Sequence, residues 1–336
     1  MIRLLSYVPG GVMIALLVLI PLLRLPSLNG GLFTPEESHY FLLVQRMAEG
    51  NALYADAWHA GPPILVWSYY FFYFLFGKAS LTVMHALSCL YIWICAIFFN
   101  GLVAQYKPFQ RFPGLPAILF VALVSFPWYS QEMSTSLAIL LPTLFAVNAI
   151  LELGDQRRKN YRLMLRTGFL MGIVVFIAYK GMFLALGIAI AYLITRRGSL
   201  DELISYLGGI AISVFITLLA LFVQGSLDDF WDIGVLYYVD RERVPLAEGY
   251  DYHAWEQVQS WFFSTGIWML LILIGWIHYR VRFFSYLAKI RTLEAIMSVW
   301  LVASICLLAF KWNQVQLDDF ILLSVPGAFY ISRVLE

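Results

Sequence analysis

Two adjacent carboxylates, Glu36 and Glu37, stand shortly after the first long apolar run of the chain, residues 8–28. Thr34 and Pro35, directly before them, are typical of a helix start, because threonine caps well and proline fits the first helical position. Glu37 would complete a capping box, whereas Glu36 has no such duty. A carboxylate beside a helix N-terminus, just outside a membrane span, can serve as a general base or bind a cation. We therefore predict that Glu36 and Glu37 are catalytic, with a helix cap as the alternative role of Glu37.

Other polar side chains that could bind a substrate lie in the same loop or at the ends of later apolar runs. For His59, a purely structural role is the alternative to a functional one. For Glu132, the alternative is a favourable charge at a helix N-terminus. Lys180 and Lys311 could meet a phosphate at the membrane boundary, or could simply extend their ammonium groups to the interface. The predicted substrate-binding residues are Tyr54, Asp56, His59, Glu132, Lys180 and Lys311.

The composition indicates the surroundings in which these residues must be positioned. Of 336 residues, 61% are hydrophobic and only 13% are charged, and the mean hydropathy is +0.77. Soluble chains carry roughly 25% charged residues because their surface faces water. The formal net charge of +1 argues against a nucleic-acid binder. We predict an all-α polytopic membrane protein in which residues 1–336 form a single transmembrane domain.

The positions of lysine and arginine orient the apolar runs, since basic loops stay on the cytoplasmic side of a membrane. Placing every basic loop inside, together with Arg3, predicts ten crossings with both termini inside. The basic loops are residues 104–113, 153–166, 196–197 and 279–292. The apolar runs lie near residues 8–28, 62–76, 81–103, 112–128, 134–151, 167–195, 203–224, 259–277, 294–310 and 317–332.

Two of these runs need a special interpretation under this topology. Run 62–76 is shorter than the roughly 20 residues of a span and is rich in Trp and Tyr, so we predict an interfacial helix. Run 167–195 has basic loops at both ends, so we predict that it turns back at Lys180 and Gly181. Lys180 would then sit at or below the outer surface, in a wet cavity. A tilted single crossing is the alternative.

Two large loops face outward in this topology, residues 29–80 and 225–258. The helix expected in the first loop has an apolar face at helical spacing, which favours a helix lying on the membrane. That face consists of Tyr40, Leu43, Val44 and Met47. The second loop mixes aromatic rings with carboxylates, a combination that suits carbohydrate but is also found in ordinary solvated loops.

The order of motifs in the first outer loop is a span, Glu36-Glu37-Ser38-His39-Tyr40, Tyr54, and then His59-Ala60-Gly61-Pro62-Pro63. This order resembles the first outer loop of GT-C glycosyltransferases, which include protein O-mannosyltransferases and aminoarabinose lipid A transferases. The family has an Asp-Glu pair here, so the resemblance places its acid–base aspartate on Glu36. Ala178-Tyr179-Lys180-Gly181 resembles the family's Thr-Lys-Gly, and Glu132 falls where the family has a second acidic residue. Lys311 resembles the basic residue that precedes its Leu/Pro-rich final span.

The resemblance implies an inverting glycosyltransferase, and a compact or degenerate member of its superfamily is one form that this could take. It would move a sugar from a polyprenyl-phosphate-linked donor to a lipid, glycan or protein acceptor. The expected location is the outer, periplasmic face of a bacterial inner membrane. A divalent cation, Mg²⁺ or Mn²⁺, stays open as a cofactor, and Asp318-Asp319 could take one, although no metal-ligand motif is present in the sequence. The alternatives are a non-catalytic GT-C-like subunit of a membrane complex, with a membrane-protein partner, and a transporter or lipid flippase.

Overall fold

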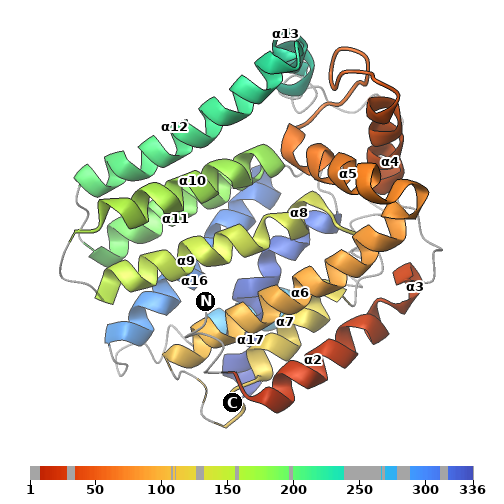
Figure 1. Cartoon of the computed structure of the whole chain (residues 1–336). Coiled ribbons are helices and arrows are strands. Elements are labelled where there is room, and N and C mark those ends of the chain that lie inside the picture. Colours follow the sequence, from red (N-terminus) through yellow and green to blue (C-terminus); the bar gives the residue numbers. More distant parts are fainter. Residues whose placement is uncertain are drawn as a thin grey trace.

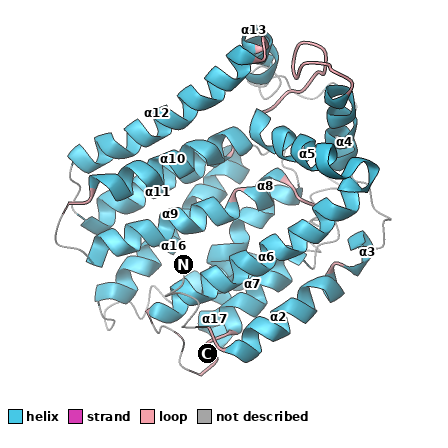
Figure 2. Ribbon diagram, in the orientation of Figure 1, coloured by secondary structure: helices cyan, strands magenta, loops and turns pink. Residues whose placement is uncertain are grey.

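The computed structural model describes residues 8–28, 35–106, 109, 111–125, 132–155, 159–196, 200–237, 266, 269–277, 288–310 and 317–335. In these ranges the regular structure is helical, and the one β contact is an isolated bridge between Leu53 and Ala57. Long helices run side by side between two ends of the molecule (Figure 1), and Figure 2 draws all described regular elements as helices. The predicted all-α class is confirmed for this part of the chain.

The long helices form the framework, and several short elements gather at one of its ends. The first six helical elements are α2 (Gly10–Leu23), α3 (Leu25–Leu28), α4 (Pro35–Ala48), α5 (Pro63–Phe76), η1 (Gly77–Ala79) and α6 (Ser80–Gln105). The next six are α7 (Leu115–Ser125), α8 (Thr135–Ala138), α9 (Leu140–Asp155), α10 (Tyr161–Ile177), α11 (Gly181–Arg196) and α12 (Leu200–Val223). They are followed by α13 (Leu227–Asp229), a π-helical segment η3 (Phe230–Tyr237), α16 (Ala288–Phe310), a 3₁₀ segment η6 (Leu317–Leu323) and α17 (Ser324–Leu335).

Four helical stretches in the described residues are long and apolar enough to cross a membrane. They are Leu81–Gln105, Thr135–Leu153, Leu200–Val223 and Thr292–Phe310, and they coincide with four of the predicted runs. Shorter apolar helices lie at Gly10–Leu23, Pro63–Phe76, Leu115–Ser125 and Gly181–Thr195. A membrane protein with several spans is therefore supported by length and composition, whereas the number of ten crossings stays a prediction.

The predicted break in run 167–195 is confirmed. α10 ends at Ile177 and α11 begins at Gly181, so the run consists of two helices joined by a short turn. Glu202 shows that they form a hairpin: its carboxylate accepts hydrogen bonds from the backbone of Asn160, before α10, and from the hydroxyl of Tyr192, near the end of α11. The two arms therefore return to the same end, and the turn with Lys180 lies at the other.

α10 also packs very closely on α12, because glycines lie where the two backbones cross. A Cβ atom on Gly168 would lie 1.9 Å from the carbonyl oxygen of Tyr206, and one on Gly209 would lie 2.1 Å from that of Leu165. A larger residue at either position would have to push the helices apart. This contact fixes the hairpin that carries Lys180.

The helices of the first outer loop, α4 and α5, pack against each other at the end of the bundle that also carries α3, α8 and α13 (Figure 1). α4 begins at Pro35, as predicted. Its apolar face does not lie open for a membrane surface, however: Tyr40, Leu43 and Val44 are buried in the protein core, and Met47 packs against it. The interpretation of this face as a membrane contact is wrong, because α5 and its neighbours already cover it.

Candidate functional site

Glu36 and Glu37, in the first turn of α4, contact different groups of residues. Successive residues of an α-helix point about 100° apart, so neighbouring side chains cannot share one direction. Glu36 accepts a hydrogen bond from the hydroxyl of Tyr40, one turn later, at 3.3 Å. Glu37 is 1% exposed and accepts one from His85 Nε2 at 2.7 Å. Glu37 is therefore buried and Glu36 is partly exposed, and each carboxylate has a hydrogen-bond partner in the protein.

A buried ion-pair group, here called the Lys180 cluster, lies on the side that Glu36 faces. Lys180 Nζ donates to Asp318 Oδ2 at 2.9 Å and to Asp319 Oδ1 at 2.8 Å. Ser136 Oγ, in α8, donates to the same Asp318 oxygen at 2.8 Å. These bonds join the hairpin turn, η6 and α8, and the charges of Lys180, Asp318 and Asp319 also act on Glu36 at the start of α4. The cluster consists of Glu36, Ser136, Lys180, Asp318 and Asp319.

The position of Lys180 corrects one detail of the sequence interpretation. The lysine lies at the turn and at the expected end of the molecule, but it is 7% exposed and its ammonium group is enclosed by two protein carboxylates. A wet cavity is therefore not its surrounding in this structure. Two carboxylates from η6 take the place of water because an unpaired ammonium group at this depth would be costly.

The surroundings of Glu36 change its acidity in the direction that suits a base near neutral pH. Burial and the negative charge of Asp318 raise the pKa of Glu36 from 4.5 to about 7, against the opposing effects of Lys180 and of the Tyr40 hydrogen bond. A catalytic base works best when its pKa lies near the working pH. Glu36 can therefore be ionised or protonated under physiological conditions, and small changes in its neighbours decide which.

The second group, here called the His85 cluster, surrounds Glu37. His85, in α6, contacts the Glu37 carboxylate through Nε2 and the carbonyl oxygen of Ser27 through Nδ1, at 2.7 and 2.8 Å. Arg24, at the junction of α2 and α3, donates to Ser88 Oγ at 3.1 Å and to the carbonyl oxygen of Glu132 at 3.3 Å. All of these side chains are buried. The cluster consists of Arg24, Ser27, Glu37, His85, Ser88 and Glu132.

Glu132 lies next to Arg24, which donates to its backbone carbonyl oxygen, and its predicted role in substrate binding stays a prediction. Glu132 is 5% exposed. Its negative charge and that of Glu37 act on the Arg24 guanidinium. The alternative, a charge placed just before a helix, is compatible with the structure, because the cap of α8 is Ser134, whose Oγ accepts from the backbone N–H of Leu137.

His59 and Tyr54 lie together in a compact loop between α4 and α5. His59 Nδ1 lies 3.3 Å from His39 Nε2, and its ring contacts those of Tyr40 and Tyr54. Burial, with a further contribution from His39, lowers the pKa of His59 to about 3, so the ring is neutral. The Tyr54 backbone has φ of +75°, rare for a residue with a side chain, and its hydroxyl donates to the carbonyl oxygen of Gly61 at 2.6 Å.

Asp56 is not brought to either cluster. Its carboxylate is exposed and accepts a hydrogen bond from the backbone N–H of Ala52 at 3.0 Å, closing the turn before α5. This is a structural duty for which Asp is well suited. Lys311 lies outside the described residues, as do Thr34 and the greater part of the second outer loop.

The described start of the second outer loop covers this end of the molecule. Phe230 packs edge-on against Tyr54, with 5.1 Å between ring centroids, and Tyr237 packs against Trp58 in the same way. Tyr179, next to Lys180, donates to the carbonyl oxygen of Gly234 at 2.8 Å. Both outer loops and the hairpin turn thus contact one another at this end of the molecule.

Arg24, His85 and the pairing of Lys180 with Asp318 and Asp319 were not anticipated from the sequence. A signal existed for two of them, since Arg24 and His85 are ionisable residues inside or at the end of apolar runs, where such residues are usually paired and functional. Within the ranges that the structure describes, no group of three or more His, Cys, Asp or Glu side chains is arranged to hold a metal ion.

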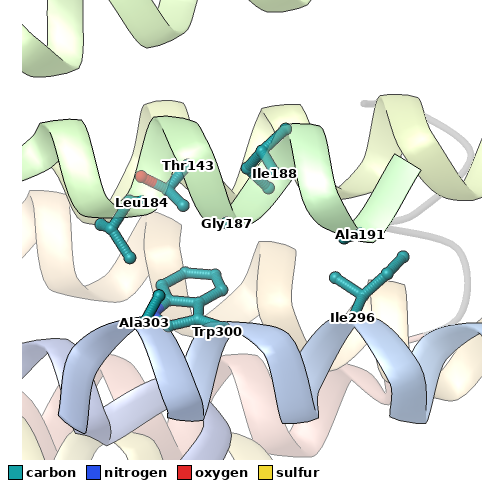
Figure 3. Close-up of a pocket in the computed structure, with 8 residues that line it drawn as sticks. All are labelled: Thr143, Leu184, Gly187, Ile188, Ala191, Ile296, Trp300 and Ala303. Carbon is teal, nitrogen blue, oxygen red and sulfur yellow. The ribbon is translucent and has the colours of Figure 1, made fainter. Parts of the chain in front are cut away.

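A crevice elsewhere in the bundle is not part of this site. It lies between α9, α11 and α16 and has a volume of about 10 Å³, near the space of one water molecule. Figure 3 shows Trp300 and Ile296 of α16 facing Leu184, Gly187 and Ile188 of α11 across it. With apolar walls and so little room, it is a packing gap and not a place for a sugar.

Comparison with known proteins identifies a solved structure with a similar fold. No protein-family model and no curated protein matches the sequence. The structure is similar to a crystal structure of ArnT from Cupriavidus metallidurans bound to undecaprenyl phosphate, with a TM-score of 0.53 and 14% sequence identity. The chain therefore has a fold similar to that of this ArnT structure. The alignment covers 97% of this chain and 60% of the ArnT chain. The resemblance seen in the first outer loop is thus confirmed at the level of the fold.

Proposed function

We propose that this protein is a GT-C-type glycosyltransferase that uses a sugar donor linked to a polyprenyl phosphate. The observation that carries the proposal is the inward-facing pair of Glu36 and Lys180, one carboxyl group with a pKa near 7 and one ammonium group, at the end of a GT-C-like bundle. The similar structure of ArnT was determined with undecaprenyl phosphate bound, which supports a lipid phosphate as the carrier.

In this proposal Glu36 acts on the acceptor and Lys180 acts on the leaving phosphate. Glu36 takes the proton from an acceptor hydroxyl as its oxygen attacks the anomeric carbon, and the bond from that carbon to the phosphate oxygen breaks. The polyprenyl phosphate leaves with the electron pair, and Lys180 balances its negative charge. A single displacement of this kind inverts the anomeric configuration. Glu37, Glu132, His59 and Tyr54 would shape the site, and Lys311 would add a second cation.

The proposed setting follows from the topology inferred from the basic loops. With ten crossings and both termini in the cytoplasm, α4, α5 and both clusters lie on the periplasmic side of an inner membrane. A lipid-linked donor would then reach the site from the outer leaflet. The acceptor is a lipid, glycan or protein on that face.

A substitution of Glu36 tests the assignment of the base. Glu36→Gln keeps the shape of the side chain but cannot take a proton, so we expect transfer from a polyprenyl-phosphate-linked donor to fall on the order of 10²–10⁴-fold. In the wild type the rate should rise with pH through about 7, because Glu36 must be ionised to act. Glu49→Gln, an exposed change just after α4, is the matched control and should leave transfer unchanged. Full activity of Glu36→Gln would show that Glu36 is not the base.

A second candidate function, a non-catalytic GT-C-like subunit, is favoured by one observation. Asp318 and Asp319 already neutralise Lys180, so a donor phosphate would have to displace at least one of them. Native mass spectrometry of the purified protein distinguishes the two functions. A co-purifying polyprenyl phosphate species supports the transferase, whereas a stable protein partner without any such lipid supports the subunit.

A further inference from the structure

His85 has an unusual set of hydrogen-bond partners for a histidine buried in an apolar helix. Its Nδ1 lies 2.8 Å from the carbonyl oxygen of Ser27, and its Nε2 lies 2.7 Å from Glu37 Oε1. A carbonyl oxygen can only accept, so Nδ1 must carry a proton. A carboxylate also only accepts, so Nε2 must carry one as well unless Glu37 itself is protonated.

The pair of His85 and Glu37 therefore holds one proton more than a neutral ring and a carboxylate would. Imidazole is the more basic partner in water, with an ordinary pKa near 6.5 against about 4.3 for a glutamate. A separation of 2.7 Å is also typical of a charge-assisted bond from a cationic nitrogen to a carboxylate. Both arguments place the extra proton on the ring, which makes His85 an imidazolium.

The charged groups around the pair are compatible with this assignment. Glu37 approaches from α4, and the positive charge of Arg24, between α2 and α3, acts against a positive charge on His85. Arg24 is itself held near Glu132 and Glu37. Two cations and two carboxylates thus share one buried region, so the imidazolium does not leave an unbalanced charge there.

We propose that His85 is doubly protonated in the resting protein and, by holding Glu37, is the positioning residue that turns Glu36 toward the Lys180 cluster. Glu36 and Glu37 are consecutive in one helical turn, so fixing the direction of one side chain fixes that of the other. His85 in turn is fixed to the end of the first helical run through Ser27. It therefore connects α3, α4 and α6 at the place where Glu36 must be aimed. Its effect on transfer rests on the proposed function; its protonation does not.

Nitrogen-15 NMR of the full chain with labelled histidine tests the protonation directly. The sequence has five histidines, so the difference between the wild type and His85→Gln identifies the His85 signals. We expect both ring nitrogens to resonate as protonated at neutral pH. Glu37→Gln provides the second measurement if His85→Gln does not fold: replacing the carboxylate should convert the signals of one doubly protonated histidine to those of a neutral ring, and this change then identifies His85. An Nε2 without a proton in the wild type would overturn the assignment.

A transfer assay tests the positioning role. We expect His85→Gln to lower kcat on the order of 10²-fold, the cost of a misplaced catalytic group, while KM for the polyprenyl-linked donor stays unchanged because Lys180 is not touched. Thr82→Ala, on the exposed side of α6, is the matched control.

The two experiments separate the possible failures. An unchanged kcat, or a rise in KM with kcat intact, contradicts the positioning role. If the wild type transfers no sugar at all, the proposed function fails, and the NMR result still decides whether His85 carries two protons.

Discussion

The Lys180 cluster and the His85 cluster are reached from neighbouring residues of α4, yet their charges are arranged differently. In the Lys180 cluster one ammonium group faces Asp318, Asp319 and Glu36, so carboxylates are in excess. Oδ1 of Asp318 is buried and has no hydrogen-bond partner among the described residues. In the His85 cluster, Arg24 and His85 stand against Glu37 and Glu132, so cations and anions are matched in number.

This difference indicates that Glu36 and Glu37 have different roles. A cluster with excess carboxylate favours the uptake of a proton, which is the property a base such as Glu36 needs. A carboxylate that is bonded to a buried ring, as Glu37 is to His85, suits an anchor of the helix. Of the two glutamates predicted to be catalytic, we therefore assign the proton transfer to Glu36 and the fixation of the helix to Glu37.

The largest expected effect comes from removing the cation of the Lys180 cluster. Lys180→Met leaves Asp318 and Asp319 buried without a counter-charge, a change that typically destabilises a protein by about 3–5 kcal/mol. Thermal unfolding in detergent measures this loss, and transfer from the lipid-linked donor should be abolished.

An exposed lysine provides the control for this prediction. Lys159 pairs with Asp201 at 2.7 Å, as close as Lys180 and its partners, but the two side chains are 50% and 61% exposed. Because water screens such a pair, Lys159→Met should leave the unfolding temperature almost unchanged. Equal effects of the two substitutions would mean that the buried position of Lys180 adds nothing to the free energy of unfolding. The comparison of the two clusters would then have no energetic support.

Local patterns in the sequence predicted more of this site than its long-range pairings. The start of α4 at Pro35 and the break before Gly181 follow from capping chemistry and from the basic loops at both ends of one apolar run. The partners of Lys180 could not be found in this way, because Asp318 is 138 residues away and no local spacing connects them. The register of η6 against the hairpin turn depends on how whole helices pack.

Other misses have a simpler cause. Run 8–28 is predicted as one crossing without a break, and the structure divides it at Arg24 into α2 and α3. An arginine at that place was a visible signal, as was His85 in the following long helix. Neither residue belongs to a motif of the resembled family, so a search by motif passed over them. Asp56 shows the opposite error, since its place in a conspicuous loop suggested binding but its carboxylate closes a turn.

A smaller effect is expected from displacing Lys180 without removing it. Gly181, directly after it, packs against α10: a Cβ atom there would lie 2.5 Å from Val174 Cγ1 and 2.7 Å from the Val174 carbonyl oxygen. Gly181→Ala must move the hairpin turn, so we expect a loss of about 1–3 kcal/mol in stability. The ion pairs of Lys180 with Asp318 and Asp319 should also become weaker. Thermal unfolding and the transfer rate measure the two consequences.

Gly208 in α12 is the matched position for this change. A Cβ atom there would lie 3.7 Å from Leu165 Cδ1, an ordinary contact, and alanine favours a helix over glycine by about 1 kcal/mol. Gly208→Ala should therefore be neutral or stabilising. If Gly181→Ala behaves in the same way, the turn has room that the geometry does not show, and the Lys180 cluster is less rigidly positioned than we infer.

The smallest effect should come from one hydroxyl group at the boundary of the Lys180 cluster. Tyr40 donates to Glu36 Oε1 at 3.3 Å and lowers the proton affinity of that carboxylate. Tyr40→Phe removes this bond, so the pKa of Glu36 should rise above about 7. The acid limb of the pH–rate profile should then move upward by less than one unit, since a hydrogen bond of this kind contributes about 0.5–1.5 kcal/mol. Tyr69 stacks on Tyr40 but donates to the carbonyl oxygen of Met133, so Tyr69→Phe should leave the limb where it is. A limb that moves equally in both variants would mean that it reports the packing of the two rings, and the pH dependence could then no longer be assigned to Glu36.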